Sequence, residues 1–221
     1  MDSAPPLTLP RTVAIVGLMG AGKSAIGKRL AMRLGLPFVD ADNEIERAAG
    51  CTIAEIFEKY GEAEFRQGER RVISRLLDES PHVLSTGGGA YMDAETRRLM
   101  KAKALTVWLR AELAVLHDRV RKRSHRPLLK QGDPREILER LMAQRYPIYA
   151  EADIVVESTA QPVDRTTEEV IAALRRHLER AAAATAGASA GGAAADGAGV
   201  RPPVRTGVYP EPSPECQTTL P

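Results

Sequence analysis

The chain has 221 residues, enough for one domain with an appendage, and its 43% apolar and 27% charged content is ordinary for a soluble protein. Its formal net charge of only +2 gives little electrostatic reason to expect nucleic-acid binding. No apolar run reaches the roughly 18 residues of a membrane span, and the N-terminus lacks the features of a signal peptide. Cys51 and Cys216 are too far apart to indicate a disulfide framework or a metal site. We therefore expect a cytoplasmic protein without a membrane partner.

A phosphate-binding loop follows the first predicted strand. Residues 1–10 carry three prolines and are expected to be a disordered lead-in, after which Thr12–Val16 reads as a buried strand. The next stretch, Gly17–Ser24, matches the G-x-x-x-x-G-K-[ST] pattern, and an amphipathic helix follows it. Backbone N–H groups of such a loop bind phosphate at the helix N-terminus. The pattern predicts that Lys23 reaches the β- and γ-phosphates and that the Ser24 hydroxyl ligates Mg²⁺.

Two carboxylates end the second predicted strand, Pro37–Asp40, and begin the helix after it. In an open parallel sheet, ligands bind beyond the carboxyl ends of the strands. There, one of Asp40 and Asp42 would hold Mg²⁺ through water, and the other would accept or orient the proton of a substrate hydroxyl. The alternative is structural: Asp42 would cap the helix and Asp40 would be a solvated strand end.

The next stretch predicts two helices that meet at Gly61, the first with a Thr52-x-x-Glu55 capping box and the second running from 62 to about 79. On the second helix, Arg66 follows an apolar aromatic residue. It is either an ordinary surface residue or a bidentate clamp for a substrate carboxylate. The predicted strand His82–Ser85 then enters Thr86–Gly89, whose glycines suit close approach of a small polar substrate. A plain flexible turn is the alternative there.

A basic segment separates the later elements. A helix from Asp93 to about Met100, a strand over Ala104–Leu109 and a helix that carries Leu113 lead into the run Arg119–Arg126. A mobile lid bearing Arg126 would close over the transferring phosphoryl group. A nucleic-acid patch is disfavoured because no aromatic residues alternate with these charges.

The remaining elements complete an alternating pattern. A helix over Arg135–Arg145, a strand over Ile154–Val156 and a helix from Thr166 to about Arg180 are predicted. Strands that alternate with helices specify a parallel sheet covered on both faces, so we expect a three-layer α/β/α domain over residues 11–180. From 181 to 199, 16 of 19 residues are Ala or Gly. We expect residues 181–221 to be mostly disordered, with the alanines extending the last helix by a turn or two.

Taken together, these stretches resemble the shikimate kinases, which have the nucleoside-monophosphate-kinase-like P-loop fold. The resemblance covers about 11 to 178. The matching stretches, in order, are Gly17–Ser24, Phe38–Asp42 with Ile45-Glu46, Gly61-Glu-x-x-Phe-Arg66-x-x-Glu69, Thr86–Gly89, Arg126–Leu129 and Arg145-Tyr146.

The resemblance implies transfer of the γ-phosphoryl group of ATP to the 3-hydroxyl of shikimate, a step of aromatic amino-acid biosynthesis. It also implies a five-stranded parallel sheet of order 2-3-1-4-5 with a mobile lid, and we expect a monomer. The implied ATP-binding residues are Gly20, Ala21, Gly22, Lys23, Ser24, Ala25 and Arg126, with Ala25 standing where relatives often carry Thr. The implied substrate-binding residues are Asp42, Arg66, Gly87, Gly88, Gly89 and Arg145.

Within that set, the resemblance assigns separate roles. Arg66 and Arg145 would hold the carboxylate, and Gly88 would bond a hydroxyl through its backbone. Asp42 would bind the ring hydroxyls and is the candidate base. The metal residues would be Ser24 and, in the outer shell of Mg²⁺, Asp40. The catalytic set would be Lys23, Asp42 and Arg126, with Lys23 and Arg126 neutralising charge in the transition state.

Two other functions remain open at this point. A P-loop kinase of another metabolite, such as gluconate or a nucleoside monophosphate, would share the fold, although a neutral acceptor has no need for both Arg66 and Arg145. A nucleotide-dependent regulatory switch is the other. The guanine-reading N-K-x-D motif of GTP switches is absent from the sequence, and a switch has no need for Asp42 and Arg66 together.

Overall fold

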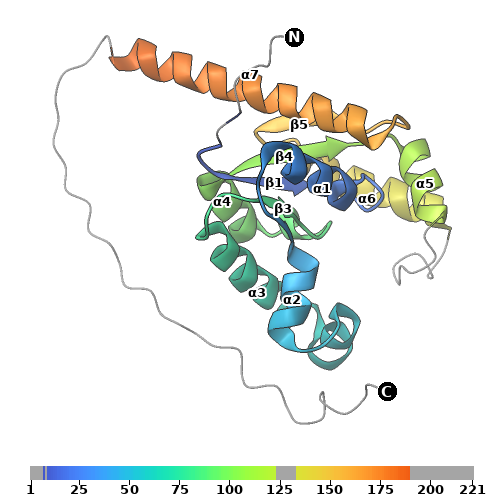
Figure 1. Cartoon of the computed structure of the whole chain (residues 1–221). Coiled ribbons are helices and arrows are strands. Elements are labelled where there is room, and N and C mark those ends of the chain that lie inside the picture. Colours follow the sequence, from blue (N-terminus) through green and yellow to red (C-terminus); the bar gives the residue numbers. More distant parts are fainter. Residues whose placement is uncertain (1–6, 8, 123–132, 190–221) are drawn as a thin grey trace.

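The computed structural model describes residues 7, 9–122 and 133–189, and it contains one five-stranded parallel sheet (Figure 1). The strand order is β2-β3-β1-β4-β5, as the resemblance implied. The strands are β1 (Thr12–Val16), β2 (Phe38–Asp40), β3 (Val83–Ser85), β4 (Ala104–Arg110) and β5 (Ile154–Glu157). The central strand β1 is buried along its whole length because helices cover both faces of the sheet. The predicted three-layer α/β/α architecture is confirmed.

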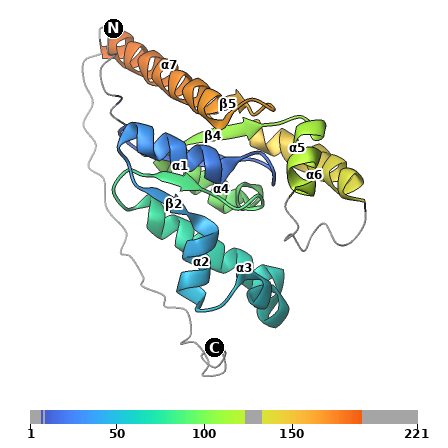
Figure 2. The same cartoon turned by 45° about the vertical axis from the view of Figure 1, so that its right-hand side comes forward.

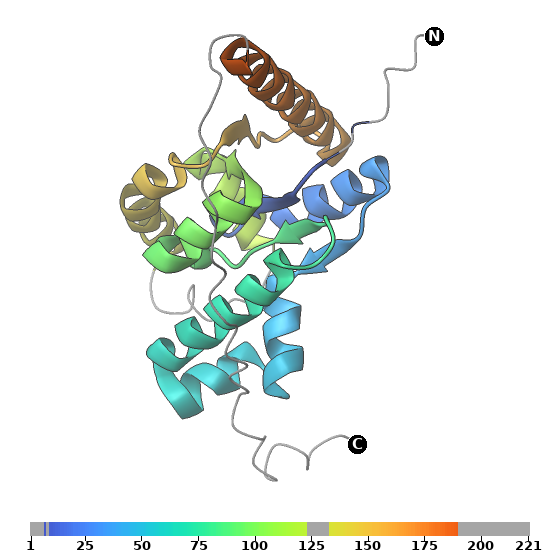
Figure 3. The same ribbon diagram turned by 90° about the vertical axis from the view of Figure 1, so that its left-hand side faces the viewer.

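Helices separate successive strands, as parallel pairing requires. They are α1 (Lys23–Leu34), α2 (Ala41–Ala49), α3 (Ile53–Leu77), the short 3₁₀ helix η1 (Ala90–Met92), α4 (Ala94–Lys103), α5 (Leu113–Arg121), α6 (Pro134–Tyr149) and α7 (Val163–Ser189). Helices α1 and α7 pack against each other on one face of the sheet. Figure 3 shows this layer above the strands, with α3 crossing below them. Among the described residues, no helix is both long and apolar enough to cross a membrane.

The predicted break at Gly61 appears as a kink within α3, where Gly61 has φ 77° and ψ 177°. The capping box of Thr52 and Glu55 is also present. The kink directs the first part of α3, together with α2, away from the body of the sheet (Figure 2). These two segments form a projecting wall beside the carboxyl end of β2.

Two predicted helix boundaries are wrong. Helix α6 does not stop at Arg145 but continues to Tyr149, with Pro147 inside it, and the buried Tyr149 side chain anchors the last turn. Helix α7 begins at Val163 rather than Thr166, and the Thr167 hydroxyl donates to the Val163 carbonyl instead of capping a helix start.

At its other end, α7 passes Arg180 and reaches Ser189, as the alanines allow. Residues 1–6 of the predicted lead-in and 190–221 of the predicted tail lie outside the described residues.

Because the five strands are parallel, the segments that follow them all begin at the same edge of the sheet. In register, Val13 lies beside Val83 and Leu105, so the residues that follow β1, β3 and β4 emerge together. Asp40 at the end of β2 pairs with Ser85 at the end of β3. The P-loop, the two aspartates and the glycine turn therefore meet where ligands bind in open α/β sheets.

Candidate active site

The P-loop wraps the N-terminus of α1 in a conformation that demands glycine. Gly20 has φ 83° and Gly22 has φ 96°, values that side chains with a Cβ rarely adopt. Gly22 is the N-cap of α1, and no side chain caps the helix. The first turn therefore presents backbone N–H groups and the positive end of the helix dipole to an anion. Lys23 Nζ donates to the carbonyls of Gly17 at 2.9 Å and Leu18 at 3.1 Å, so its ammonium group lies across the loop.

Three oxygen-bearing side chains meet beside this loop. Ser24 Oγ donates to Asp40 Oδ2 at 3.0 Å and lies 3.3 Å from Ser85 Oγ. Hydroxyl and carboxylate oxygens are the donors that Mg²⁺ prefers, and in kinases such a site is completed by water and phosphate oxygens. The residues present therefore fit a magnesium ion. Ser85 was not among the predicted residues, and its place at the end of β3 was the available signal.

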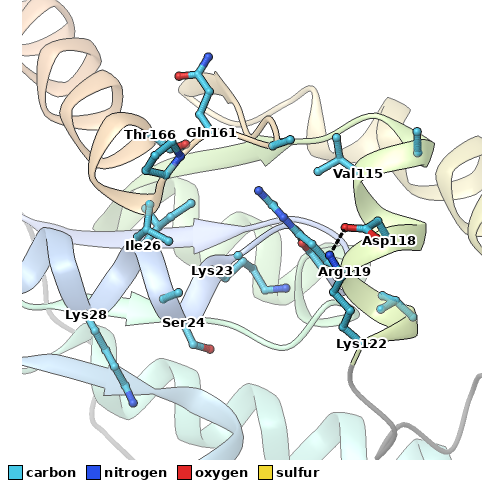
Figure 4. Close-up of a pocket in the computed structure, with 18 residues that line it drawn as sticks. Lys23, Ser24, Ile26, Lys28, Val115, Asp118, Arg119, Lys122, Gln161 and Thr166 are labelled. Atoms are coloured by element: carbon cyan, nitrogen blue, oxygen red, sulfur yellow. Dashed lines mark hydrogen bonds and ion pairs between the residues drawn. The ribbon is translucent and has the colours of Figure 1, made fainter.

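A cavity of about 1150 Å³ opens on the other side of the P-loop (Figure 4). Its walls are the loop and the start of α1, helix α5, and the segment before α7; they include Gly22, Lys23, Ser24, Val115, Arg119, Gln161 and Pro162. Arg119 extends from α5 (Figure 4) and ties the three walls together. Its Nη1 donates to the Gly20 carbonyl at 3.2 Å and to Ser158 Oγ at 2.9 Å, and its Nη2 donates to the Thr159 carbonyl. In the sequence, Arg119 stands out only as part of a basic run.

Asp42 faces the glycine turn rather than capping α2. The cap is Asp40, whose Oδ1 accepts a hydrogen bond from the Asp42 N–H at 3.2 Å. The structural alternative, in which Asp42 caps the helix and Asp40 is a solvated strand end, is therefore wrong. A Cβ built on Gly87 would lie 2.8 Å from Asp42 Oδ1 and 3.2 Å from Glu69 Oε1. Glycine at position 87 thus makes room for two carboxylates.

Arg66 lies against the same turn from the side of α3. Its Nη1 donates to Glu69 Oε2 at 2.6 Å, and its Nη2 bonds the exposed Glu62 at 3.3 Å. A Cβ on Gly89 would lie only 2.5 Å from Arg66 Nη2, so the guanidinium occupies the space that glycine leaves. Arg66 is therefore not the ordinary surface residue of the alternative interpretation.

Burial has the largest single effect on the pKa values of Glu69 and Arg66. Desolvation raises the pKa of the Glu69 carboxyl, and the Arg66 guanidinium opposes that shift. For Arg66, desolvation favours the neutral form, but the charges and hydrogen bonds of Glu69 and Glu62 outweigh it and raise the pKa of the guanidinium. Glu69 was noted only as part of a motif. Its spacing of three residues from Arg66 on a helix was the signal that the two side chains meet.

Arg145 closes the opposite side of the turn. Its Nη1 donates to the Gly88 carbonyl at 2.8 Å, and the buried Tyr149 hydroxyl donates to the same oxygen. A Cβ on Gly88 would lie 3.6 Å from both Arg145 Nη1 and the Gly17 carbonyl. Gly88 is thus packed between the P-loop and α6. Tyr149 was not predicted, because the predicted helix ended four residues before it.

The structure brings most of the predicted site residues together. Gly20, Ala21, Gly22, Lys23, Ser24 and Ala25 form the loop and the start of α1, with Asp40 beside Ser24; Asp42, Arg66 and Arg145 surround the neighbouring turn of Gly87, Gly88 and Gly89. Arg126 lies outside the described residues, so its predicted place in a lid stays a prediction.

Comparison with known proteins identifies the family. The family profile described as shikimate kinase matches residues 19–175. A shikimate kinase of Paramagnetospirillum magneticum is 59% identical over 169 residues, which cover 76% of this chain and 87% of that protein. The solved shikimate kinase from Acinetobacter baumannii in complex with shikimate has a TM-score of 0.70 and 36% identity, and the match covers 73% of this chain and 90% of that one.

A gluconokinase from Sinorhizobium meliloti is similar at a TM-score of 0.56 with 21% identity over 77% of this chain and 95% of its own, which shows the fold alone. The profile match, the identity to relatives and the site geometry all agree. The chain therefore belongs to the shikimate kinase family and is an enzyme with shikimate kinase activity.

Proposed function

We propose that this site transfers the γ-phosphoryl group of Mg²⁺-bound ATP to the 3-hydroxyl of shikimate, giving shikimate 3-phosphate and ADP. The observation that carries the proposal is the position of the Thr86–Gly89 turn. Its Gly88 faces the Gly17 carbonyl of the P-loop and accepts a hydrogen bond from Arg145, while Gly87 and Gly89 leave the space that Asp42 and Arg66 occupy. A phosphate site and a site for a hydroxylated carboxylate thus share one wall, which phosphoryl transfer requires.

On the donor side, the loop N–H groups and Lys23 would bind the ATP phosphates. To do so, Lys23 exchanges its bonds to the Gly17 and Leu18 carbonyls for bonds to phosphate oxygens. Ser24 would ligate Mg²⁺, with Asp40 in the outer shell, and the bound ion would neutralise phosphate charge. The adenosine part fits the cavity beyond Lys23, where Arg119 and Pro162 offer a flat cation and an apolar ring.

On the acceptor side, Arg66 and Arg145 would hold the shikimate carboxylate from opposite sides of the glycine turn. An anionic acceptor must approach an anionic nucleotide, and the two guanidinium groups offset that repulsion. Asp42, beside Gly87, would orient the acceptor hydroxyl and take its proton. That the Acinetobacter baumannii relative was solved in complex with shikimate supports the choice of acceptor.

The remaining parts of the proposal rest on the sequence. Arg126 would neutralise transition-state charge from a lid. The enzyme would act as a cytoplasmic monomer, with its catalytic domain over residues 11–180 and a dispensable segment over 181–221.

The test is an ADP-formation assay with purified full-length protein, ATP and Mg²⁺, in parallel with shikimate, quinate, gluconate and nucleoside monophosphates. We expect turnover with shikimate at a kcat/KM at least about 100-fold above that of every other acceptor, because the two arginines and Asp42 would together select the fixed distance between the carboxylate and the acceptor hydroxyl on the shikimate ring. Phosphate-coupled NMR of the product identifies the hydroxyl that is modified. Folded protein without shikimate-dependent turnover, or with gluconate preferred, would refute the proposal.

A further inference from the structure

The last turn of α6 places a buried tyrosine directly behind the proposed carboxylate clamp. Tyr149 follows Arg145 by four residues, so both side chains lie on the same face of the helix. The Tyr149 side chain is 0% exposed, and its hydroxyl donates to the Gly88 carbonyl. Burial raises the pKa of Tyr149 to about 12, against the effect of the Arg145 guanidinium, so the hydroxyl keeps its proton throughout the physiological range.

Arg145 and Tyr149 share one acceptor. Arg145 Nη1 also donates to the Gly88 carbonyl, at 2.8 Å, and the charge of its guanidinium acts to lower the pKa of the Tyr149 hydroxyl. These contacts fix two things at once: the plane of the peptide between Gly88 and Gly89, and the rotamer of Arg145. A guanidinium whose rotamer is already fixed loses less conformational entropy when it binds a carboxylate.

The tyrosine ring is itself held on three sides. Its centroid lies 5.9 Å from that of Trp108, 6.3 Å from that of Tyr91 and 6.4 Å from that of Tyr146. Aromatic rings at these separations pack favourably, and they leave the Tyr149 hydroxyl one direction in which to point. A group supported in this way can position a binding residue on a rigid element.

We propose that Tyr149 is a positioning residue for the acceptor: its hydroxyl holds Gly88 and Arg145 in the geometry that receives the shikimate carboxylate. The proposal rests on the proposed function, since it takes Arg145 as one arm of that clamp. Tyr149 does not itself touch the acceptor, because it is buried behind Gly88. Its contribution is therefore expected in shikimate affinity and not in ATP affinity.

The chain supplies a matched control for the key variant, Tyr149→Phe. Tyr146 lies on the same helix in the same aromatic cluster, and its hydroxyl also donates to a backbone carbonyl, that of Ala111, on the far side from the glycine turn. We expect Tyr149→Phe to raise the shikimate KM about 10-fold, the cost of one buried hydrogen bond and a loosened clamp, and to leave the ATP KM within about two-fold. Tyr146→Phe should leave both constants within about two-fold of wild type.

Two further measurements separate positioning from general support of the fold. Tyr149→4-aminophenylalanine restores a donor on a ring of the same shape and should return the shikimate KM to within about three-fold of wild type. In the Arg145→Ala background, Tyr149→Phe should change the shikimate KM by less than about three-fold, since the charged one of the two groups that it positions is gone and only the effect on Gly88 is left. Folding is followed through Trp108, the only tryptophan of the chain and a neighbour of the Tyr149 ring. If Tyr149→Phe does not fold, Tyr149→4-methylphenylalanine, which fills the space of the hydroxyl without donating, replaces it.

Each possible result of these measurements either supports the proposed role of Tyr149 or overturns it. A raised shikimate KM that 4-aminophenylalanine rescues, and that shrinks without Arg145, supports the proposal. An unchanged shikimate KM, an equal loss for ATP, or full additivity with Arg145→Ala overturns it while wild-type turnover leaves the proposed function intact. Wild-type protein without shikimate-dependent turnover overturns the proposed function and this inference with it.

Discussion

Arg66 and Glu69 form an ion pair in which Arg66 Nη1 lies 2.6 Å from Glu69 Oε2, and the glutamate side chain is almost completely buried. The arginine side chain keeps 26% of its surface exposed. The pair is therefore asymmetric: the Glu69 carboxylate is buried, whereas the Arg66 side chain is partly exposed. Since a buried carboxylate is costly unless it is paired, this arrangement fixes Arg66 in one direction.

Replacing Glu69 by Gln should weaken binding of the acceptor. Gln keeps the shape and one acceptor oxygen but loses the negative charge that anchors Arg66, so we expect the shikimate KM to rise about 10-fold with a small change in the ATP KM. Glu62→Gln is the matched control, because Glu62 contacts the same guanidinium from an exposed position and surface ion pairs contribute little. Steady-state kinetics of the three proteins test this, and equal effects of the two variants would contradict it.

The same carboxyl should leave a signature in the pH dependence of stability. Burial raises the pKa of Glu69 above its usual 4.5, with Arg66 opposing the shift and Asp42 and Asp93 adding to it. A raised pKa in the folded state means that the contribution to stability is full below about pH 4.5 and is lost as the pH rises through the raised pKa. Urea unfolding from about pH 4 to about pH 7 should show wild type losing stability relative to Glu69→Gln as the pH increases. The opposite result would be a free energy of unfolding of wild type, relative to Glu69→Gln, that is independent of pH or rises with pH. It would show that the ion pair with Arg66 outweighs the burial of the Glu69 carboxyl.

Gly89→Ala should damage the site without damaging the fold. Gly89 has φ −101° and ψ −17°, a conformation that alanine adopts readily, but the new Cβ would lie 2.5 Å from Arg66 Nη2. The end of a flexible side chain moves at little cost, so we expect the free energy of unfolding to change by less than about 1 kcal/mol. The displaced guanidinium should cost about 10-fold or more in kcat/KM for shikimate. Paired unfolding and kinetic measurements decide; a large loss of stability would mean that Arg66 cannot move.

Asp40→Asn should raise the Mg²⁺ requirement. Asn keeps an oxygen to cap α2 at the Asp42 N–H, so stability should change by less than about 1 kcal/mol, while the charge beside Ser24 is lost. We expect the Mg²⁺ concentration for half-maximal activity to rise about 10-fold. Asp93→Asn, the same change at the N-cap of α4, is the control and should leave that concentration unchanged. If wild type, Asp40→Asn and Asp93→Asn reach half-maximal activity at the same Mg²⁺ concentration, Asp40 is not part of the metal site.

Arg119→Lys should act on ATP alone. Lysine keeps the charge but cannot bridge the Gly20 carbonyl, Ser158 and the Thr159 carbonyl, so the three walls of the cavity lose their common link. We expect the ATP KM to rise about 10-fold with the shikimate KM within about two-fold. Arg121→Lys, at an exposed position two residues later, is the matched control. A loss that falls on shikimate instead would place Arg119 in the acceptor site.

Local sequence rules determined much of this protein. The P-loop pattern, the capping box at Thr52 and the alternation of strands and helices each depend on interactions between near neighbours, so they are readable in order along the chain. The same locality explains the errors in the last two helices. Helix α6 runs past the predicted end at Arg145, and the buried Tyr149 in its last turn is held by tertiary contacts that no local rule shows.

Only the tertiary structure decided which further side chains hold the predicted site residues in place. Ser85, Arg119 and Tyr149 belong to none of the matching motifs, and Glu69 only ends one. The roles of the first three depend on distant partners, up to 99 residues away in the bond from Arg119 to the Gly20 carbonyl. The sequence by itself determined the phosphate-binding loop and the residues that resemble an acceptor site. The fold alone decided how those residues are held, because burial and hydrogen bonding between distant segments exist only once the sheet has assembled.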